Sequence, residues 1–371
     1  MKSTLFVLIL VMSPALFSCN KSEDPDYSAL NNQIVAEWER VSDSILATSS
    51  VPGMLIGIWA PDRNLTWVVG KGKANLATGE KPGTAMSYRM ASLTKTYTYT
   101  VLLQLADAGT ISLSDKLDKY FPGFPKADSV TIRMLCNHTS GIFDYLETNA
   151  FLVSLVTNPL KKWSNQEMID LVRDEPYYFS PGTTFRYSNT NTIFAGAIIQ
   201  QITGNLAATE IRQRILDPLH LVNTHYPDNP ELPVPFVHGY GWGDEDRTDV
   251  SEAYDPSFAG DAGAMITVLD DMKVWVKTLY EGTLLSPQMQ AERLTVVPAI
   301  GEDCEEYGLG IMHKIDPSMW GHTGTIPGYK NWAGYCPEKN VTIVISYNAT
   351  TDHPMVLAVR LMKIYMETVK Q

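Results

Sequence analysis

The spacing of apolar residues along the first part of the chain changes from helical to strand-like and back. Residues 29–49 carry apolar side chains every three or four positions, which predicts an amphipathic helix. Two apolar runs at 54–59 and 65–69 then flank a turn-like Pro-Asp-Arg-Asn segment, a pattern that is typical of a β-hairpin. Residues 93–108 next predict a helix that Gly109 ends.

The final part of the chain returns to strand-like patterns. A helical pattern at 268–280 is followed by four strand-like runs, at 306–312, 318–324, 331–336 and 341–347. A closing amphipathic helix is predicted from Pro354 to about residue 369. Because strands occur towards both ends of the chain with helices between them, we expect an α+β (α/β) fold. In this fold one antiparallel sheet, built from both chain ends, is flanked by helices.

The middle of the chain, roughly residues 111–259, is rich in Pro, Gly and Asn. Its helical patches are at 130–137, 165–173 and 190–203. The last patch is apolar nearly all round, so it should be buried. We therefore predict a mostly helical subdomain at 111–259 and a sheet subdomain formed by 29–110 and 260–371. Together they would make one domain over residues 29–368.

The first residues have the pattern of a bacterial targeting segment. A positive start precedes a mostly apolar run at 5–16, which is too short to span a bilayer comfortably. The run ends in Leu16-Phe17-Ser18-Cys19, which resembles a lipobox, in which the Cys is acylated. We expect residues 1–19 to be a lipoprotein-type signal peptide, Cys19 the lipidation site and residues 20–28 a polar tether. The protein would then be periplasmic or at the cell surface, anchored to a membrane; the alternative is an ordinary signal peptide.

Composition and charge narrow the function classes. The 371-residue chain has a formal net charge of −12, which argues against nucleic acid, because phosphate binding needs clustered Lys and Arg. The seven His residues form no His-x-x-x-His or similar pair, and Cys136, Cys304 and Cys336 lack metal-type spacing. We therefore expect no metal or cofactor. The protein is also expected to be a monomer. The three cysteines should be small buried residues, with a Cys304–Cys336 bridge as the alternative.

Ser92-Leu93-Thr94-Lys95 is the first candidate for chemistry. Residues three apart share a helix face, so the Ser92 hydroxyl should lie beside the Lys95 amine. A buried amine loses its proton more readily and can help to activate the hydroxyl. The Ser92 N–H would point at a substrate carbonyl from the helix start. A Ser-x-x-Lys occurs about once by chance in such a chain, and a helix cap with an exposed Lys is the ordinary alternative.

Tyr187-Ser188-Asn189 and His322-Thr323-Gly324 are the second and third candidates. Near cations, the Tyr187 phenol could ionise and act as general base, and the Asn189 amide could bind a substrate amide and the Lys. His322 would supply positive charge or a hydrogen-bond donor near Tyr187. The ordinary alternatives are a half-buried aromatic residue and a structural histidine.

The strand that carries His322 is expected to edge the site. Gly324 would leave room for an extended substrate to approach the backbone. The N–H of Thr325 would be a second oxyanion donor, and the Thr323 hydroxyl would bind a substrate carboxylate.

The order, spacing and context of these motifs resemble a known family. Penicillin-binding proteins and class A β-lactamases carry Ser-x-x-Lys, Ser-Asp-Asn and Lys-Thr-Gly. With Tyr in the second motif and His in the third, the chain resembles the class C β-lactamase and D-alanyl-D-alanine carboxypeptidase family of penicillin-recognising serine hydrolases, over residues 29–368. Further stretches that carry the resemblance are Leu135–Gly141, Pro181-Gly182, Gly263-Ala264 and Tyr307–Gly310. The His-Thr-Gly form is more similar to the secreted DD-carboxypeptidases.

The resemblance implies a β-lactamase/transpeptidase-like fold and a mechanism through an acyl-enzyme. Ser92 would attack a carbonyl, Lys95 and Tyr187 would manage its proton, and the N–H groups of Ser92 and Thr325 would hold the oxyanion. Water or an amine would then resolve the acyl-enzyme. By the same resemblance Asn189 would position the substrate.

Substrate recognition departs from the family pattern at one point. By resemblance, Phe258 would form an aromatic wall. The secreted carboxypeptidases place an Arg for the substrate's terminal carboxylate just after the Gly-Leu-Gly strand, where this chain continues Ile311-Met312-His313-Lys314. His313 or Lys314 could replace it, but a Lys cannot reproduce the two-pronged Arg contact. The stretch His138–Gly141 is interpreted as structural.

The leading hypothesis is a D-alanyl-D-alanine carboxypeptidase-like hydrolase that acts on peptidoglycan peptides. Alternatives within the enzyme class are a class C-like β-lactamase, an esterase and a D-amino-acid amidase. A penicillin-binding sensor that acylates but hardly turns over is the alternative outside that class. The expected partners are a small peptide or β-lactam substrate and, through the anchor, a membrane.

Overall fold

The computed structural model describes residues 27–241, 247–299 and 304–370. The expected signal peptide at 1–19, its Cys19 and the tether up to residue 26 lie outside the described residues. Within those three ranges, none of the helices is both long enough and apolar enough to cross a bilayer.

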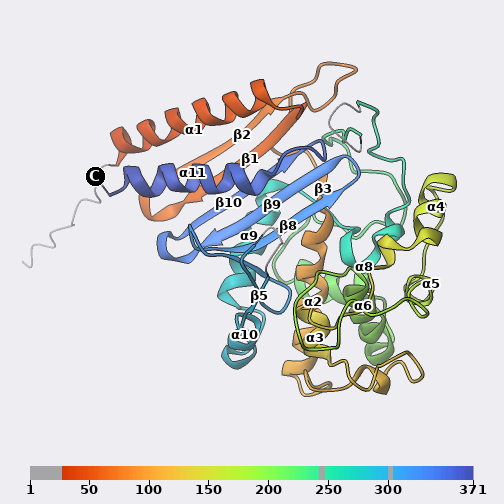
Figure 1. Ribbon diagram of the computed structural model, residues 1–371. Helices are drawn as coiled ribbons and strands as arrows, with labels where there is room; N and C mark the ends of the chain where they lie inside the picture. Colours follow the sequence, from red (N-terminus) through yellow and green to blue (C-terminus); the bar gives the residue numbers. More distant parts are fainter. Residues whose placement is uncertain (1–26, 242–246, 300–303, 371) are drawn as a thin grey trace, which may run out of the picture.

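An eight-stranded antiparallel sheet forms the centre of the molecule, in the order β2-β1-β10-β9-β8-β7-β6-β5 (Figure 1). The strands are β1 (Gly53–Ala60), β2 (Leu65–Gly72), β5 (Val297–Pro298), β6 (Glu306–Tyr307), β7 (Met312–Lys314), β8 (Met319–Ile326), β9 (Tyr329–Cys336) and β10 (Val341–Tyr347). The first hairpin of the chain pairs with the last strand, in the register Ile56↔Ile345. The sheet is therefore assembled from both ends of the chain, which confirms the predicted fold class.

Helices cover both faces of this sheet. The terminal helices α1 (Ser28–Thr48) and α11 (Pro354–Thr368) lie side by side on one face, and α9 (Leu269–Glu281) lies on the other (Figure 1). Trp38 of α1 is buried and donates its indole N–H to the carbonyl oxygen of Leu361 at 2.9 Å. Because both faces are covered, β1 is buried along its whole length.

The remaining helices form a second layer next to the sheet. They are α2 (Thr94–Asp107), α3 (Ile132–Cys136), α4 (Asn149–Thr157), α5 (Asn165–Asp170), α6 (Thr190–Thr203), α7 (Ala207–Ile211), α8 (Gly260–Gly263) and α10 (Pro287–Arg293). The apolar helix α6 packs against α2, α3, α5 and α8 and is buried on most sides, as its sequence predicted. Its Gly196 lies so close to Asp261 that an added Cβ would meet the carboxylate at 1.8 Å.

Some short elements differ from the sequence prediction. The single strand expected at 306–312 is interrupted: residues 306–307 form β6, residue 312 begins β7, and residues 308–311 turn the chain between them. Gly310 in this turn has a φ of 75°, and the N–H of Gly308 donates to the carbonyl oxygen of Ile311. The small ladder of β3 (Tyr88–Arg89) and β4 (Ile266–Thr267) was not predicted, because two residues are too few to show a periodicity. The thiols of Cys136, Cys304 and Cys336 are buried, and no disulfide joins them in the part of the chain described.

Candidate active site

Ser92 lies in a 3-10 turn, Ala91–Leu93, that leads directly into α2. The preceding residue, Ala91, has a φ of 54°, a left-handed conformation that costs a non-glycine residue on the order of 1 kcal/mol or more. Such backbone strain persists only where the surrounding structure imposes it, and it is concentrated at functional sites. Ser92 is thereby placed at the N-terminal end of α2, where the helix dipole favours negative charge.

Lys95 lies in the first turn of α2, where its side chain is buried next to Ser92. Its Nζ donates to Ser92 Oγ at 3.0 Å, to Asn189 Oδ1 at 2.7 Å and to the carbonyl oxygen of Ala262 at 2.8 Å. The structure thus brings together three residues that the sequence motifs singled out from two distant segments. The alternative of a helix cap with an exposed Lys does not hold, because the Lys95 side chain is buried.

The buried position of Lys95 changes its proton affinity. Burial lowers the pKa of Lys95 to about 7, and the nearby carboxyl of Asp144 opposes that shift. An amine with this pKa is substantially neutral at pH 7, and a neutral amine has a lone pair that can accept the Ser92 proton. Lys95 can therefore act as the general base that activates the hydroxyl.

Asp144 completes this network, although no sequence motif pointed to it. Asp144 is buried, and its Oδ2 accepts hydrogen bonds from the backbone N–H and the Nδ2 of Asn189, at 3.0 and 2.7 Å. Its Oδ1 accepts one from the N–H of Leu146 at 3.0 Å. Because Nδ2 of Asn189 faces Asp144, the amide oxygen faces Lys95. Asp144 thus orients Asn189 and places a carboxyl near the Lys95 amine.

Replacing Asp144 by Asn is expected to move the pH dependence of the enzyme. Without the carboxyl that raises it, the pKa of Lys95 falls further below its ordinary value, so the acid limb of kcat/KM moves to lower pH. The new Nδ2 would also face the N–H of Leu146, donor against donor, so we expect a roughly tenfold lower maximum. The measurement is a pH profile of kcat/KM.

The matched control for this variant is Asp261→Asn. Asp261 is as buried as Asp144, at 5% exposure each, and its carboxyl accepts hydrogen bonds from Asn165 and Tyr226. The control should leave the acid limb in place. A lower rate for the Asp144 variant with an unmoved limb would show that Asp144 only supports the local structure.

Tyr187 lies next to Lys95, whose Nζ is 4.9 Å from the centre of the phenol ring. The Tyr187 ring stacks on His138, with the ring centroids 4.3 Å apart. His138 Nδ1 accepts a hydrogen bond from the N–H of Ser188 at 3.2 Å, and burial lowers the pKa of His138 well below its ordinary value. The stretch His138–Gly141, which was interpreted as structural, therefore supplies the neutral His138 ring that supports the ring of Tyr187.

The His322 ring is neutral and is not a source of positive charge, which corrects one of the two roles predicted from the sequence; the other role was a hydrogen-bond donor near Tyr187. The His322 ring is buried between two partners, the carbonyl oxygen of Thr323 at 2.6 Å from Nδ1 and the Tyr307 hydroxyl at 2.9 Å from Nε2. Nδ1 must donate to the carbonyl, so Nε2 accepts from Tyr307. Burial lowers the pKa of His322 to about 3. Both ring nitrogens of His322 thus have hydrogen-bond partners within the protein. The centroids of the His322 and Tyr187 rings are 6.1 Å apart.

Gly324 allows β8 to pass close to the turn that carries Ser92. A Cβ at this position would lie 2.3 Å from the carbonyl oxygen of Met90 and 3.2 Å from the Cβ of Ala91. The sequence prediction gave this space to the substrate, whereas the structure gives it to the protein's own backbone. On either side of Gly324, Thr325 lines the same cavity as Ser92, and the Thr323 hydroxyl is 3.6 Å from the sulfur of Met312. The orientation of the Thr325 N–H towards an oxyanion stays a prediction.

A cavity of about 130 Å³ opens beside Ser92. Much of its wall consists of the apolar and aromatic residues Tyr145, Leu146, Phe151, Leu152, Leu155 and Phe258. Phe258 is the residue expected from the family resemblance to form an aromatic wall, and its carbonyl oxygen accepts the Tyr145 hydroxyl at 2.8 Å. Asn189 also lines the cavity. Among the residues described, those that line it include no Asp, Glu, Lys, Arg or His.

The two candidates to replace the carboxylate-binding Arg are engaged elsewhere. His313 Nδ1 lies 2.7 Å from a carboxylate oxygen of Glu306, and its ring stacks on Trp320. Lys314 forms an ion pair with Glu305. Neither side chain lines the Ser92 cavity, so the structure offers no cation for a substrate carboxylate within the described lining.

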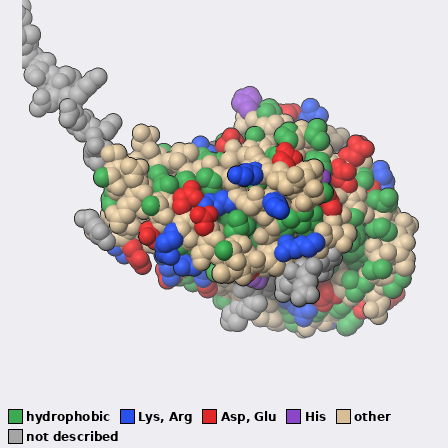
Figure 2. Space-filling view, turned by 90° about the horizontal axis from the view of Figure 1, so that it is seen from above, with side chains coloured by type: hydrophobic (Ala, Val, Ile, Leu, Met, Phe, Trp, Pro, Cys, Tyr) green, Lys and Arg blue, Asp and Glu red, His purple; other side chains and the backbone are tan. Residues whose placement is uncertain are grey.

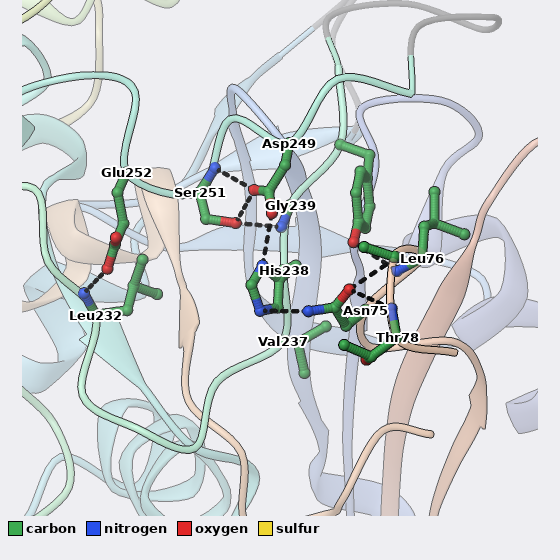
Figure 3. Close-up of polar contacts among 12 residues, drawn as sticks. Asn75, Leu76, Thr78, Leu232, Val237, His238, Gly239, Asp249, Ser251 and Glu252 are labelled. Atoms are coloured by element: carbon green, nitrogen blue, oxygen red, sulfur yellow. Dashed lines mark hydrogen bonds and ion pairs between the residues drawn. The ribbon is translucent and has the colours of Figure 1, made fainter. Parts of the chain in front are cut away.

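A second Ser, His and Asp cluster lies in the loops around His238 (Figure 3). Asp249 contacts His238 Nδ1 at 2.6 Å, and Asn75 Nδ2 contacts His238 Nε2 at 3.0 Å. The Ser251 hydroxyl donates to Asp249 Oδ1 at 2.5 Å. His238 Nε2, the ring nitrogen that does not face Asp249, is held by the Asn75 amide. The histidine is therefore not placed to take a proton from the serine. This cluster ties two loops together and is not a nucleophilic site.

Comparison with known proteins places the chain in a family. The Beta-lactamase family model matches residues 38–364, so the chain belongs to that family. Penicillin-binding protein 4* of Bacillus subtilis (strain 168) is 27% identical over 282 residues, which are 71% of this chain but only 61% of that protein. The chain thus spans less than two thirds of the length of that relative.

Solved structures agree with this assignment. A D-stereospecific amidohydrolase from Streptomyces sp. is 29% identical with a TM-score of 0.77, and the match covers 91% of this chain and 98% of that one. The D-amino acid amidase from Ochrobactrum anthropi SV3, in its complex with D-phenylalanine, is 26% identical with a TM-score of 0.79, covering 92% and 99%. Both cover nearly the whole chain, and they confirm the predicted fold.

Proposed function

We propose that this protein is a serine hydrolase that acts through an acyl-enzyme on Ser92 and cleaves amides of D-amino acids with an apolar side chain. The observation that carries the proposal is the Ser92–Lys95 pair at the edge of an uncharged, largely apolar cavity. An apolar side chain next to the scissile carbonyl gains free energy from burial there. The two solved relatives act as amidohydrolase and amidase by name, which supports the amide substrate.

The proposed reaction follows from the network around Ser92. Lys95 takes the Ser92 proton while Oγ attacks the carbonyl, and that proton then passes to the leaving amine. The N–H groups of Ser92 and Thr325 hold the oxyanion, and Tyr187 assists the proton transfers. Water attacks the ester of Ser92 in the second half of the reaction and releases the acid.

A D-alanyl-D-alanine carboxypeptidase that acts on peptidoglycan peptides is the second candidate. The three motifs and the penicillin-binding relative favour it. A carboxypeptidase must bind a free carboxylate, however, and His313 and Lys314 are both paired with glutamates. A β-lactamase and a penicillin-binding sensor would share the acylation step and differ in how fast water resolves the acyl-enzyme. An esterase would share the same step and differ in the bond that it cleaves.

The test compares D-phenylalanine amide, L-phenylalanine amide and an N-acyl-D-alanyl-D-alanine peptide. We expect kcat/KM for D-phenylalanine amide to exceed the value for the peptide at least about tenfold, since the described lining of the cavity has no cation to compensate the buried carboxylate of the peptide. Faster release of D-alanine than of ammonia would reverse the order of the two candidates. Intact mass measured over time with a β-lactam would separate a stable adduct, as in a sensor, from rapid drug hydrolysis.

We also propose that the protein is exported and anchored through a lipid on Cys19. The sequence of the first residues supports this proposal. Incorporation of labelled fatty acid into the wild type but not into a Cys19→Ala variant would support it, and equal incorporation would refute it.

A further inference from the structure

Helix α4 (Asn149–Thr157) has an unusual composition for a helix at the surface. It contains five large apolar residues and no charged residue in nine positions: Asn149-Ala150-Phe151-Leu152-Val153-Ser154-Leu155-Val156-Thr157. A surface helix ordinarily turns a polar face outwards. Here Val153 and Val156 are instead 62% and 82% exposed.

Exposed apolar residues gather in and just after this helix. Ten large hydrophobic residues are exposed among those described; Leu152, Val153 and Val156 lie in α4, and Leu160 follows three residues after its end. Hydrophobic side chains also gather at the right-hand end of the space-filling view, the end of the molecule where α4 lies (Figures 1 and 2). Contiguous apolar surface of this kind marks a place where a ligand or partner binds.

The apolar surface of α4 is continuous with the Ser92 cavity. Phe151, Leu152 and Leu155 line the cavity. At about 100° per residue, Val156 follows Leu152 around the helix and Val153 follows Val156. Leu152 belongs to both surfaces, since it lines the cavity and is 47% exposed. One apolar strip, formed by these five residues, therefore runs from the cavity over its rim to the solvent.

We propose that this strip binds a long, unbranched apolar chain on the acyl part of the substrate. The proposal rests on the proposed acyl-enzyme chemistry of Ser92. A cavity of about 130 Å³ is smaller than the roughly 300–1,000 Å³ of sites for drug-sized ligands, so a long group must leave it. The α4 side of its rim is apolar. Continuity with the cavity favours a chain on the substrate over a separate partner molecule.

The chemistry of the reaction is unchanged by this strip. Ser92 Oγ displaces the alcohol or amine, which leaves with a proton, and water then releases the free acid. What the strip adds is burial of methylene groups beyond the cavity. Because it shields only one side of the chain, we expect kcat/KM to rise about twofold per methylene group, which is less than full burial would give.

The experiment uses p-nitrophenyl esters from acetate to octanoate. For the wild type we expect roughly a 15-fold rise over the four methylene groups between butanoate and octanoate. In a Val153→Ser, Val156→Ser double variant the octanoate-to-butanoate ratio should fall to about 3 or less. The ratio is taken within each protein, so a change in the amount of active enzyme cancels.

The matched control is a Val222→Ser, Val356→Ser double variant. These valines are 73% and 62% exposed and do not line the Ser92 cavity. The control should keep the wild-type ratio. A flat chain-length series in the wild type, or an unchanged ratio in the α4 variant, would overturn the inference. Failure to hydrolyse both the acetate ester and D-phenylalanine amide would instead overturn the hydrolase proposal and this inference with it.

Discussion

A Ser92→Ala variant should lose covalent labelling by a β-lactam and hydrolyse substrates at least about 10⁴-fold more slowly than the wild type. The Ser92 hydroxyl is the group that Lys95 contacts at the cavity, and an acyl-enzyme cannot form without it. Because Ala lacks only one oxygen atom, the fold should be preserved. The measurements are the intact mass of the protein after incubation with the β-lactam and kcat/KM for the substrate.

A Ser188→Ala variant is the matched control. Ser188 is also buried and lies between Tyr187 and Asn189, but its hydroxyl contacts only the carbonyl oxygen of Phe143, at 3.4 Å, among the contacts described. This control should label normally. Labelling that persists in the Ser92 variant would show that another group carries the acyl chemistry. Labelling that disappears in both variants would show that its loss is not specific to Ser92.

The long periodic elements of the fold could be predicted from the sequence. The helix at 29–49, the first hairpin and the closing helix were expected within a few residues of their observed bounds. The apolar stripes of both helices face one core, and the first strand of the hairpin contributes to the cores on both faces of the sheet, so tertiary packing reinforces the local pattern. The run at 306–312 was wrongly predicted as one continuous strand, because its apolar residues suggested a strand throughout, whereas Gly310 adopts a positive φ and turns the chain between β6 and β7.

The contacts of the site were predictable only where a local spacing set them. The three-residue spacing of Ser92 and Lys95 gave their proximity directly. Asp144 lies 45 residues from Asn189, and a lone Asp has no pattern that would mark it. The signal that could have found it is its place three residues after the His138–Gly141 stretch that carries the family resemblance.

The charge state of His322 could not be predicted from the sequence, for a different reason. A His-Thr-Gly motif is compatible with an exposed imidazolium or with a buried neutral ring, and burial decides between the two. The Tyr307 hydroxyl that occupies Nε2 comes from strand β6, 15 residues earlier in the chain. Only the folded structure places that hydroxyl against the ring.

Replacing Lys95 by Met is expected to remove catalysis and at the same time to change how stability depends on pH. Met has a similar length but no proton acceptor for the Ser92 hydroxyl, so kcat/KM should fall at least about 10³-fold. In the wild type, kcat/KM should rise with pH around 7, as the Lys95 ammonium loses its proton. Activity measurements across pH 5 to 9 test both expectations.

The stability of this variant is the more discriminating result. The pKa of Lys95 is about 7 in the folded protein and about 10.5 in an unfolded chain, so between these values the unfolded state binds more protons. The free energy of unfolding of the wild type should therefore rise relative to the Met variant as the pH increases from about 7 to about 10, by a few kcal/mol. Denaturant unfolding of both proteins at pH 6.5 and 9.5 measures it. Equal pH dependence would mean that Lys95 keeps an ordinary pKa, and the general base would then have to be sought at Tyr187.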